Sequence, residues 1–414
     1  MRILFIIQGE GRGHLTQALS LRQKLSAEGH EIVGVMVGKS PARRLPDFFK
    51  EKIQTPIYSF ESPNFLPTAK NKQVYITSSV IYNIFRTPKY LASVWYIRRM
   101  IHETKADVVV NFYELLTGLA YLFFRPKAWM ICIGHQYLFL HPDFQFPKEL
   151  SWASLRSLRF FTRVTAIGAT RKLALSFRKM RDIPQKGMVV VPPLLRKEVL
   201  EASPSSGNYL HGYLLNSGFS EEVQVWHKEH PEVDLRFFWD KKDVEPVLRM
   251  DDHLSFHQLD DVSFLQYMAG AKAYATTAGF ESVCEAMYLN KPVLMVPTHI
   301  EQACNAHDAS LSGAGVVADR FDLDALLRLS KSTQTNPAFR YWVEQADWLI
   351  LQEFRKDKLN HKKDVTPFNI LVRLTAHHTP AIPRPAVAST IASGMRKVLN
   401  VMLMIAGGIV RPMP

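Results

Sequence analysis

The first residues whose types and spacing could do chemistry lie at the turn Gln8-Gly9-Glu10-Gly11-Arg12-Gly13-His14, after an apolar run. Glycine permits positive φ and lets a ligand approach the backbone closely. A helix beginning here would offer free N–H groups and the positive end of its dipole, which suits an anion. His14 titrates near neutrality and could be a general base, although a capping or packing histidine is the alternative.

The spacing of these glycines argues against two common nucleotide sites. It is Gly-x-Gly-x-Gly, whereas the dinucleotide fingerprint is Gly-x-Gly-x-x-Gly and a P-loop needs Gly-Lys-Ser/Thr. No acidic residue stands at a suitable ribose position after the second expected strand. The turn therefore favours neither a dinucleotide nor ATP.

A second group of candidate residues begins where an apolar run ends at Thr276-Thr277. The small turn Ala278-Gly279 then opens a helix that starts Phe280-Glu281-Ser282. A helix N-terminus of this kind can hold a diphosphate. Glu285 lies four residues after Glu281 and so on the same helix face, where its carboxylate could accept hydrogen bonds from two ribose hydroxyls.

The next expected strand ends at Pro297, so Glu301-Gln302 should lie in a loop on the same rim of the sheet. Both side chains could bind sugar hydroxyls. Asn305-Ala306 follows shortly after. The Asn216-Ser217-Gly218 turn could also touch phosphate, and an ordinary turn with a helix cap is the alternative interpretation.

Together these motifs resemble those of GT-B glycosyltransferases, above all the UDP-glucuronosyl/glucosyltransferases and the lipid-linked N-acetylglucosaminyltransferase of peptidoglycan synthesis. In those families a small-Gly turn begins a helix, a Glu on that helix binds the ribose, and an acidic-Gln pair followed by Asn-Ala contacts the donor sugar. The matching positions are Ala278-Gly279, Glu285, Glu301-Gln302 and Asn305-Ala306. Gly11-Arg12-Gly13-His14 matches a glycine-rich turn ending in His, which in some members is the catalytic base.

The resemblance implies an α/β protein with the GT-B fold, in which two Rossmann-like αβ domains face a cleft. It implies inverting transfer of a sugar from a nucleotide-diphosphate sugar, expected to be a UDP-sugar, to a hydroxyl acceptor. His14 is the expected base, and Glu114, just after the strand expected at 108–112, is its rival or could orient it. The expected donor-binding residues are Asn216, Ser217, Gly218, Thr277, Ala278, Gly279, Phe280, Glu281, Ser282, Glu285, Glu301, Gln302 and Asn305.

The expected acceptor side comprises the turn Gly11, Arg12 and Gly13 together with His135 and Gln136, although a structural role suits His135 better. No metal and no cofactor beyond the nucleotide sugar are expected. The sequence contains no Asp-x-Asp motif, and the pairs Asp251-Asp252 and Asp260-Asp261 suit capping or solvated positions. Helix dipoles and N–H groups would instead stabilise the leaving phosphate.

Alternating elements must position these residues. Strands are expected at 3–7, 32–37, 108–112, 129–133, 164–167 and 188–191, then at 209–215, 234–239, 254–259, 273–276 and 292–296; the first-half helices are expected from near His14, Tyr75, Leu115, Trp152 and Thr170. Continuous apolar strands separated by helices predict parallel sheets covered on both faces. The expected domains are 1–202 for the acceptor, a linker at 203–208, 209–330 for the donor, helices within 331–376 that pack back across the cleft, and a tail at 377–414.

The chain has 414 residues, 47% of them apolar, and a formal charge of +13. Its three cysteines suit a reduced compartment, and neither a secretory signal nor a membrane helix is recognisable. Cytoplasmic placement is expected. Basic residues mixed with aromatics near Trp152–Phe161 and Tyr82–Met100 could contact the inner face of an anionic membrane and so reach a lipid or lipid-linked acceptor; a core stripe with a solvated face is equally consistent.

Two other functions fit part of the pattern. A nucleotide-sugar 2-epimerase shares the two-domain fold but needs no acceptor. A non-enzymatic protein that binds membranes or nucleic acid would explain the positive charge. Nucleic acid is not an expected partner, because the chain has no RNA-recognition signature and no helix-turn-helix pattern.

Overall fold

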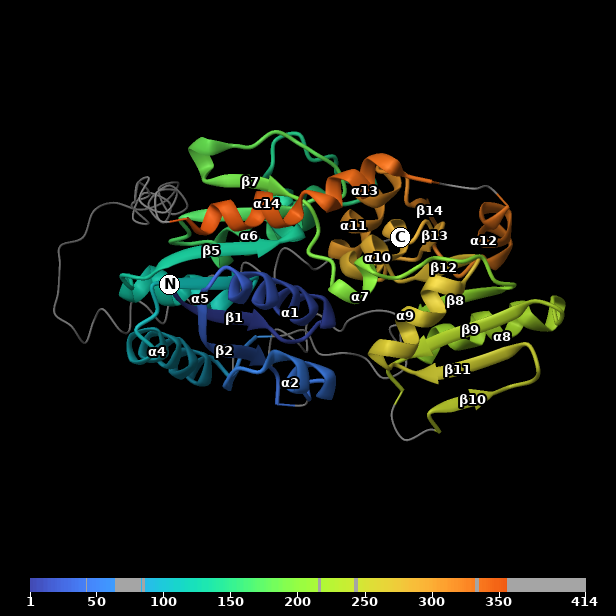
Figure 1. Ribbon diagram of the computed structural model, residues 1–414, viewed down its shortest axis with the longest axis horizontal. Helices are drawn as coiled ribbons and strands as arrows, with labels where there is room; N and C mark the ends of the chain where they lie inside the picture. Colours follow the sequence, from blue (N-terminus) through green and yellow to red (C-terminus); the bar gives the residue numbers. More distant parts are fainter. Residues whose placement is uncertain are drawn as a thin grey trace.

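The computed structural model describes residues 1–355 except 42, 64–82, 84–85, 215–216, 242–244 and 332–334. Its elements form two α/β units that lie side by side (Figure 1). The expected helix near Tyr75 and the tail at 377–414 lie outside the described residues. The three cysteines are free and buried.

The first unit is a seven-stranded parallel sheet of order β3-β2-β1-β4-β5-β6-β7. Its strands are β1 (Arg2–Gln8), β2 (Glu31–Lys39), β3 (Ile57–Glu61), β4 (Val108–Phe112), β5 (Trp129–Gly134), β6 (Arg171–Leu175) and β7 (Met188–Val191). Its helices are α1 (Arg12–Ala27), α2 (Asp47–Ile53), α4 (Thr87–Glu103), α5 (Leu115–Phe124), α6 (Trp152–Thr165) and α7 (Lys197–Leu200), with 3₁₀ turns η1 (His135–Leu140) and η2 (Pro184–Lys186).

The second unit is also seven-stranded, in the order β10-β11-β9-β8-β12-β13-β14, and only β10 is antiparallel to its neighbour. Its strands are β8 (Tyr209–Leu214), β9 (Asp234–Trp239), β10 (Val247–Arg249), β11 (Leu254–Gln258), β12 (Ala273–Thr276), β13 (Val293–Met295) and β14 (Gly315–Val317). Its helical elements are η3 (Ser217–Phe219), α8 (Ser220–Glu229), α9 (Asp261–Gly270), α10 (Phe280–Tyr288), α11 (Ile300–Leu311) and α12 (Leu323–Ser330).

Strand β1 shows why both faces of the first sheet are covered. Ile3, Phe5 and Ile7 are buried in one core with residues of α1 and α2. Leu4 and Ile6 point the other way, into a core shared with α4 and α5. Successive side chains of a strand alternate between faces, so a continuously apolar strand requires helices on both sides.

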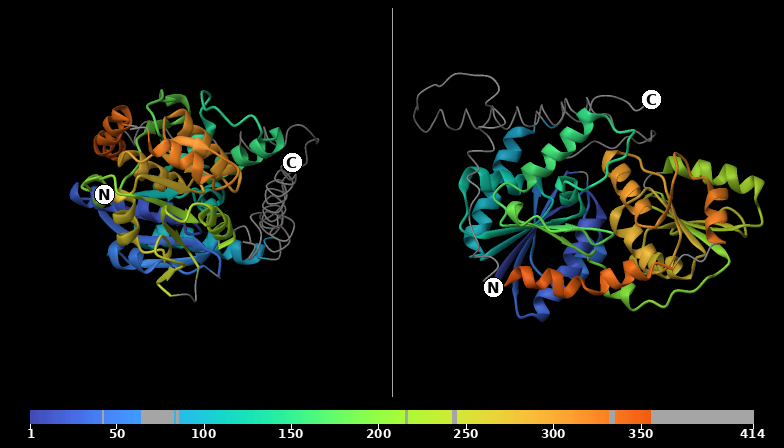
Figure 2. Two further views of the ribbon diagram at one scale, coloured as in Figure 1. Left: turned by 90° about the vertical axis from the view of Figure 1, so that its right-hand side faces the viewer. Right: turned by 90° about the horizontal axis from the view of Figure 1, so that it is seen from above.

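The last described helices return to the first unit. Helix α13 (Pro337–Glu344) contacts α10, and α14 (Ala346–Leu351), followed by η4 (Gln352–Phe354), contacts α1 and β7 (Figures 1 and 2). Trp342 of α13 donates its indole N–H to the Ser176 carbonyl at 2.9 Å. The C-terminal helices therefore link the two units.

Two expectations for the first unit are wrong. The expected strand at 164–167 begins inside α6, whose start is capped by Ser151, and Val164 and Ile167 are buried by the end of that helix. The helix expected from Thr170 is strand β6 instead. Strand β6 is short and begins with Arg171 and Lys172, so its residues do not alternate clearly between apolar and polar. Its extended structure is determined by pairing with β5 and β7.

Candidate active site

The functional candidates gather at the carboxyl ends of strands from both sheets. His14 follows β1, Gln136 follows β5, and Glu281 and Glu301 begin the helices after β12 and β13. In parallel α/β sheets this edge is where ligands bind. Helices α1 and α10 contact each other across the boundary between the units.

The glycines of the β1–α1 turn serve different purposes. Gly9 donates its N–H to the Gly38 carbonyl at 2.7 Å, and a Cβ at Gly9 would lie 2.5 Å from Val37 Cγ1, so close strand packing requires it. Gly11 precedes α1 with open space beside it. A Cβ at Gly13 would come 3.2 Å from Glu281 Cγ, so this glycine permits close approach of the second unit.

His14 is buried, and both of its ring nitrogens have partners. Nδ1 lies 3.3 Å from Gln17 Oε1, and Nε2 lies 3.3 Å from Gln136 Nε2. Burial lowers the pKa of His14 to about 4, and the contact with Gln17 offsets this only in part. The imidazole is therefore neutral at pH 7 and able to accept a proton.

Glu114 does not orient His14; it is the N-cap of α5. Its Oε1 accepts hydrogen bonds from the Leu116 N–H at 3.0 Å and the Ser62 hydroxyl at 2.7 Å. Burial raises the pKa of Glu114 to about 7. The expectation that Glu114 orients His14 is therefore wrong for the described contacts. The role of Glu114 as an independent base remains a prediction.

His135 has the structural role that suited it better from the sequence. Its Nδ1 donates to the Leu175 carbonyl at 2.8 Å, its Nε2 lies 3.8 Å from Asp308 Oδ2, and its ring stacks on Phe280 at 4.3 Å. Arg178 also binds the Asp308 carboxylate. These contacts join the two units beside the candidate site.

Gln136 is a member of the site. Its amide nitrogen lies against His14 and also donates to Glu301 Oε1 at 2.8 Å. Burial raises the pKa of Glu301. Gln302, in contrast, accepts from the backbone N–H and hydroxyl of Thr298, at 2.9 and 2.7 Å, and so fixes the loop before α11.

The β12–α10 turn leaves the start of its helix uncapped. Thr276 and Thr277 are buried, Ala278 has a positive φ of 63°, and Gly279 precedes α10 without a side-chain cap. Ser282 donates to the Gly279 carbonyl, and Asn305 donates to the Ala278 carbonyl, which holds the turn in place. The first N–H groups of α10 are thus available to an anion.

Glu281, in the first turn of α10, reaches across to the first unit. Its Oε1 accepts from Gln17 Nε2 at 2.6 Å, while its buried Oε2 has no hydrogen-bond partner among the described residues. Burial raises the pKa of Glu281 to about 8, against the opposing effect of Gln17. At pH 7 this carboxyl is mainly the neutral acid, which could donate a hydrogen bond from Oε2.

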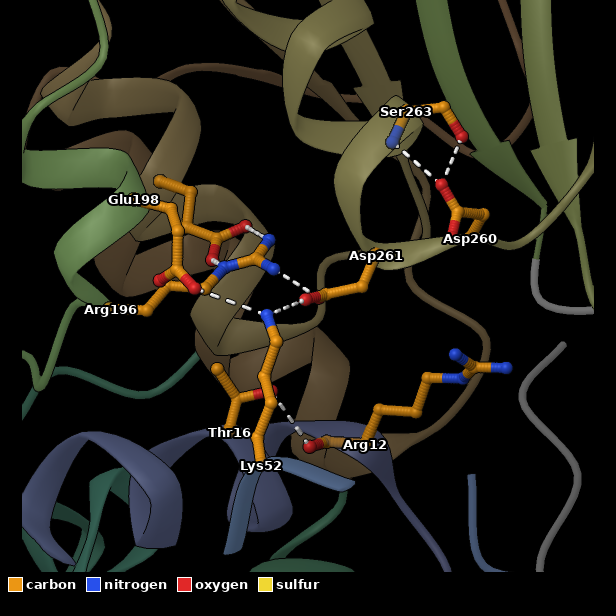
Figure 3. A network of polar contacts seen from close by, with 9 residues as sticks. Arg12, Thr16, Lys52, Arg196, Glu198, Asp260, Asp261 and Ser263 are labelled. Carbon is orange, nitrogen blue, oxygen red and sulfur yellow. Dashed lines mark hydrogen bonds and ion pairs between the residues drawn. The ribbon is translucent and has the colours of Figure 1, made fainter. Parts of the chain in front are cut away.

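Glu285, one turn further along α10, is held by Arg196 from the segment between β7 and α7. Arg196 Nε and Nη2 donate to the two carboxylate oxygens of Glu285 at 2.7 and 3.1 Å. The network of Figure 3 continues from Arg196 to Asp261 and from there to Lys52, which also binds Glu198 at 3.1 Å. The Arg196 guanidinium thus links the start of α7 to α9 and α10, beside the carboxylate predicted to bind ribose.

Arg12 crosses between the units. It donates from Nη2 to Asp240 Oδ1 at 2.8 Å, just after β9, and Arg43 Nη1 lies 3.7 Å from the other oxygen of that carboxylate. Of the predicted 216–218 turn, Asn216 and the Ser217 side chain lie outside the described part, and Gly218 lies in η3. Their predicted contacts with phosphate stay untested.

Sequence reasoning missed Gln17 and Arg196. Gln17 follows His14 by three residues on a helix, a spacing that puts both on one face, so the pattern could have revealed it. Arg196 follows a double proline, and nothing in its local sequence points to Glu285 some ninety residues later. Asp261 was expected to be capping or solvated; Asp260 caps α9, but Asp261 binds Arg196 and Lys52.

Within the described residues no helix is long and apolar enough to cross a membrane. Within the same residues no three His, Cys, Asp or Glu side chains converge as metal ligands would. The pairs Asp251-Asp252 and Asp260-Asp261 therefore belong to no group of this kind. Asp251, for example, accepts hydrogen bonds from the N–H groups of His253 and Leu254.

Comparison with known proteins places these features in a family. The model of "Glycosyl transferase family 1" matches residues 1–330. A putative UDP-glucuronosyltransferase, ugt-48, of Caenorhabditis elegans is 31% identical over 108 residues, which are 25% of this chain and 19% of that protein. The match thus spans about a fifth of that relative's length.

Solved structures share the fold at low sequence identity. The glycotransferase of kitacinnamycin superposes with a TM-score of 0.57 at 16% identity, covering 86% of this chain and 99% of its own. Arabidopsis thaliana UGT89C1, complexed with UDP-L-rhamnose, gives 0.55 at 14% identity, covering 91% and 98%. These likenesses confirm the predicted GT-B fold, and the family match argues against the non-enzymatic alternative. The chain belongs to glycosyl transferase family 1.

Proposed function

We propose that this protein transfers a sugar from a UDP-sugar to a hydroxyl group with inversion at the anomeric carbon. In this reaction His14 Nε2 takes the proton of the acceptor hydroxyl, whose oxygen then bonds to the anomeric carbon. The bond from that carbon to the diphosphate breaks, and UDP leaves with the electron pair. A single displacement from the opposite face inverts the configuration.

The observation that carries the proposal is the meeting of His14 and the uncapped start of α10 across the boundary between the units. Gln17 contacts both His14, at 3.3 Å, and Glu281 of α10, at 2.6 Å. One side chain, that of Gln17, therefore joins the proposed base to the first turn of the helix that we propose binds the diphosphate. This is the arrangement that an acceptor and a donor need in order to react.

On the donor side, Glu285 would bind the ribose. Arg196 occupies one lone pair on each carboxylate oxygen and keeps the group oriented. Each oxygen retains a second lone pair, so two ribose hydroxyls can still donate to the carboxylate. The structure of UGT89C1 was determined with UDP-L-rhamnose, which supports UDP as the nucleotide to test first.

The start of α10 would stabilise the leaving diphosphate without a metal. Negative charge grows on the phosphate as the bond breaks, and free N–H groups at a helix start favour it. Oε2 of neutral Glu281 could add one more hydrogen bond, whereas the ionised carboxylate would repel the phosphate. Metal independence is part of this proposal and is tested by activity in the presence of a chelator.

For the acceptor we propose a lipid or lipid-linked hydroxyl reached at an anionic membrane. The side chain of Trp95 on α4 is 59% exposed and that of Trp152 on α6 is 72% exposed. Arg98 lies over the Trp95 ring at 4.9 Å and Arg156 over the Trp152 ring at 5.1 Å. Exposed tryptophan beside arginine suits the interface of an anionic bilayer. Leu158 and Phe160, in contrast, pack against the core, so only part of the expected stripe is available.

Product analysis tests the proposed reaction. The protein is incubated with UDP-glucose, UDP-N-acetylglucosamine or UDP-glucuronic acid, with and without a lipid extract, and UDP release and glycosylated products are followed by mass spectrometry. Acceptor-dependent UDP release with a glycosylated product is expected. An epimerised sugar formed without acceptor would establish the 2-epimerase alternative instead.

Vesicle flotation tests the proposed membrane contact. Wild type and Trp95→Ser/Trp152→Ser are compared on vesicles with and without anionic lipid at physiological salt. We expect binding to anionic vesicles that weakens in the double variant. Equal flotation of both proteins, or none of either, would contradict the assignment of this surface.

A further inference from the structure

The two ring nitrogens of His14 face chemically opposite ends of two glutamine amides. Nδ1 lies 3.3 Å from the carbonyl oxygen of Gln17, and Nε2 lies 3.3 Å from the amide nitrogen of Gln136. An amide oxygen only accepts hydrogen bonds, and an amide nitrogen only donates them. The two contacts therefore have a direction, provided that the amides cannot turn over.

Two carboxyl groups of the second unit oppose that rotation when their facing oxygens act as acceptors. Gln17 Nε2 donates to Glu281 Oε1 at 2.6 Å, and Gln136 Nε2 donates to Glu301 Oε1 at 2.8 Å. A flipped amide would point its oxygen at the accepting oxygen of the acid. Neutral Glu281 keeps Gln17 in this orientation when its proton is on Oε2, which has no hydrogen-bond partner among the described residues, so that Oε1 accepts.

Both contacts then require the same tautomer of the imidazole. Nδ1 faces an acceptor and must carry the proton, whereas Nε2 faces a donor and must present its lone pair. The hydrogen bond made by one ring nitrogen fixes the state of the other. Among the described residues no carboxylate hydrogen-bonds to His14 directly, so neutral amides take the orienting role that a carboxylate often has.

We propose that Gln17 and Gln136 are positioning residues that hold His14 as the Nδ1-protonated tautomer, with Glu281 and Glu301 fixing the two amides when the units meet. The proposal rests on the proposed function only in making His14 the base. An acceptor hydroxyl would replace the Gln136 amide at Nε2 and donate its proton there. The resulting imidazolium keeps its Nδ1–H on Gln17. The donor-binding unit thus prepares the base that lies on the other unit.

The test reads the tautomer directly. The full-length chain is labelled with ¹⁵N-histidine, and long-range ¹H–¹⁵N spectra at pH 7.5 report which ring nitrogen carries the proton. His14 is assigned by comparison with His14→Gln. We expect the Nδ1-protonated form in the wild type. A His14 protonated at Nε2 in the wild type would overturn the proposal, whatever the variants at Gln17 and Glu281 do.

Variants then identify what holds the tautomer. Gln17→Met keeps the length and helix propensity of the side chain but removes both polar ends, and should shift His14 toward the Nε2-protonated form. Glu281→Ala should shift it partly, whereas Glu281→Gln, which retains an accepting oxygen, should not. Gln23→Met, an exposed glutamine of the same helix, is the matched control. A Gln17→Met spectrum identical to the wild type would overturn the role of Gln17.

Calorimetry with UDP on the same samples separates this proposal from the proposed function. Normal UDP binding with the wrong tautomer would overturn the positioning role alone. The expected tautomer without UDP binding would overturn the donor site and leave the amide arrangement standing.

Discussion

Two strand–turn–helix segments with glycine at the turn contribute to the candidate site, one in each unit. The contacts made by their residues differ. At the β1–α1 turn the side chains are already engaged: Arg12 binds Asp240, and both nitrogens of His14 face amides. The starts of α1 and α10 both lack a side-chain cap: a Cβ at Gly11 would meet nothing within 4 Å, and one at Gly279 nothing closer than Ser282 Oγ at 3.7 Å. The two turns differ in the side chains that accompany them: the first carries the proposed base, His14, and the second is followed on α10 by the predicted ribose carboxylate, Glu285.

This difference shows that a glycine-rich turn does not by itself indicate a phosphate site. Gly9 and Gly13 are needed because other parts of the protein come close to them. Because the start of α1 is uncapped as well, the diphosphate site is expected at α10 for a further reason: Glu285, the predicted ribose ligand, lies on that helix. We therefore expect variants at the two turns to separate catalysis from donor binding.

The largest expected effect is on the rate of transfer in His14→Ala. Loss of a general base should lower kcat by about 10²- to 10⁴-fold, because the acceptor hydroxyl then loses its proton unaided. His102→Ala, an exposed histidine on α4, is the matched control. A kcat within threefold of the wild type would exclude His14 as the base and return Glu114 to consideration.

A smaller effect is expected for Arg196→Met, which leaves Glu285 in place but removes its bidentate partner. The carboxylate then loses its orientation, and UDP affinity should fall about tenfold, in line with the loss of one charge-assisted contact at 1.5–3 kcal/mol. Calorimetry measures it, with Arg22→Met on α1 as a control. If UDP instead binds more tightly, Arg196 competes with the ribose rather than supporting it.

The pH profile should distinguish the two turns. The lowered pKa of His14, about 4, predicts that kcat/KM persists below pH 6 and falls only near pH 4. Glu281, with its pKa raised to about 8, should impose an alkaline limb of about tenfold per pH unit if only its neutral form accepts the diphosphate. Glu281→Gln should abolish the alkaline limb alone. An unchanged alkaline limb in that variant would assign it to another group.

The smallest expected effect is on stability. Burial raises the pKa of Glu281 from 4.5 to about 8, so the folded state holds a proton that the unfolded state releases between these values. This stabilisation is complete below pH 4.5 and is lost as the pH rises through 8. Glu281→Gln does not titrate, so its Tm relative to wild type should rise by several degrees between pH 5 and pH 8.5. A constant difference would show that Glu281 has an ordinary pKa in the folded protein.

Much of the fold could be predicted from the sequence, and the failures have physical causes. Strands 108–112, 188–191, 234–239 and 273–276 were predicted with the observed bounds because they are apolar runs between helices. Strands β3, β10 and β14 were missed: β3 mixes polar with apolar residues, and β10 and β14 have only three residues each, too few for a periodic signal. Strand β6 was shifted because tertiary pairing, rather than its own residues, determines it.

The candidate site could be predicted where residues are close in sequence. The Glu281–Glu285 spacing and the turn before His14 were recognisable because a helix or a turn alone positions them. The bridges that complete the site, such as Gln17 to Glu281 and Arg196 to Glu285, join residues far apart in the chain. Their pairing depends on how the two units meet, which local spacing does not encode.

The measurement that tests the account most directly is a calorimetric titration of UDP, GDP and dTDP into wild type, His14→Ala and Glu285→Ala. The account predicts that UDP binds the wild type selectively, that His14→Ala keeps this affinity within about twofold, and that Glu285→Ala loses at least about tenfold, as expected when charge-assisted hydrogen bonds are removed. Equal UDP affinity in the wild type and Glu285→Ala would contradict the placement of the nucleotide at α10. Failure of every diphosphate to bind the wild type would contradict the donor site itself.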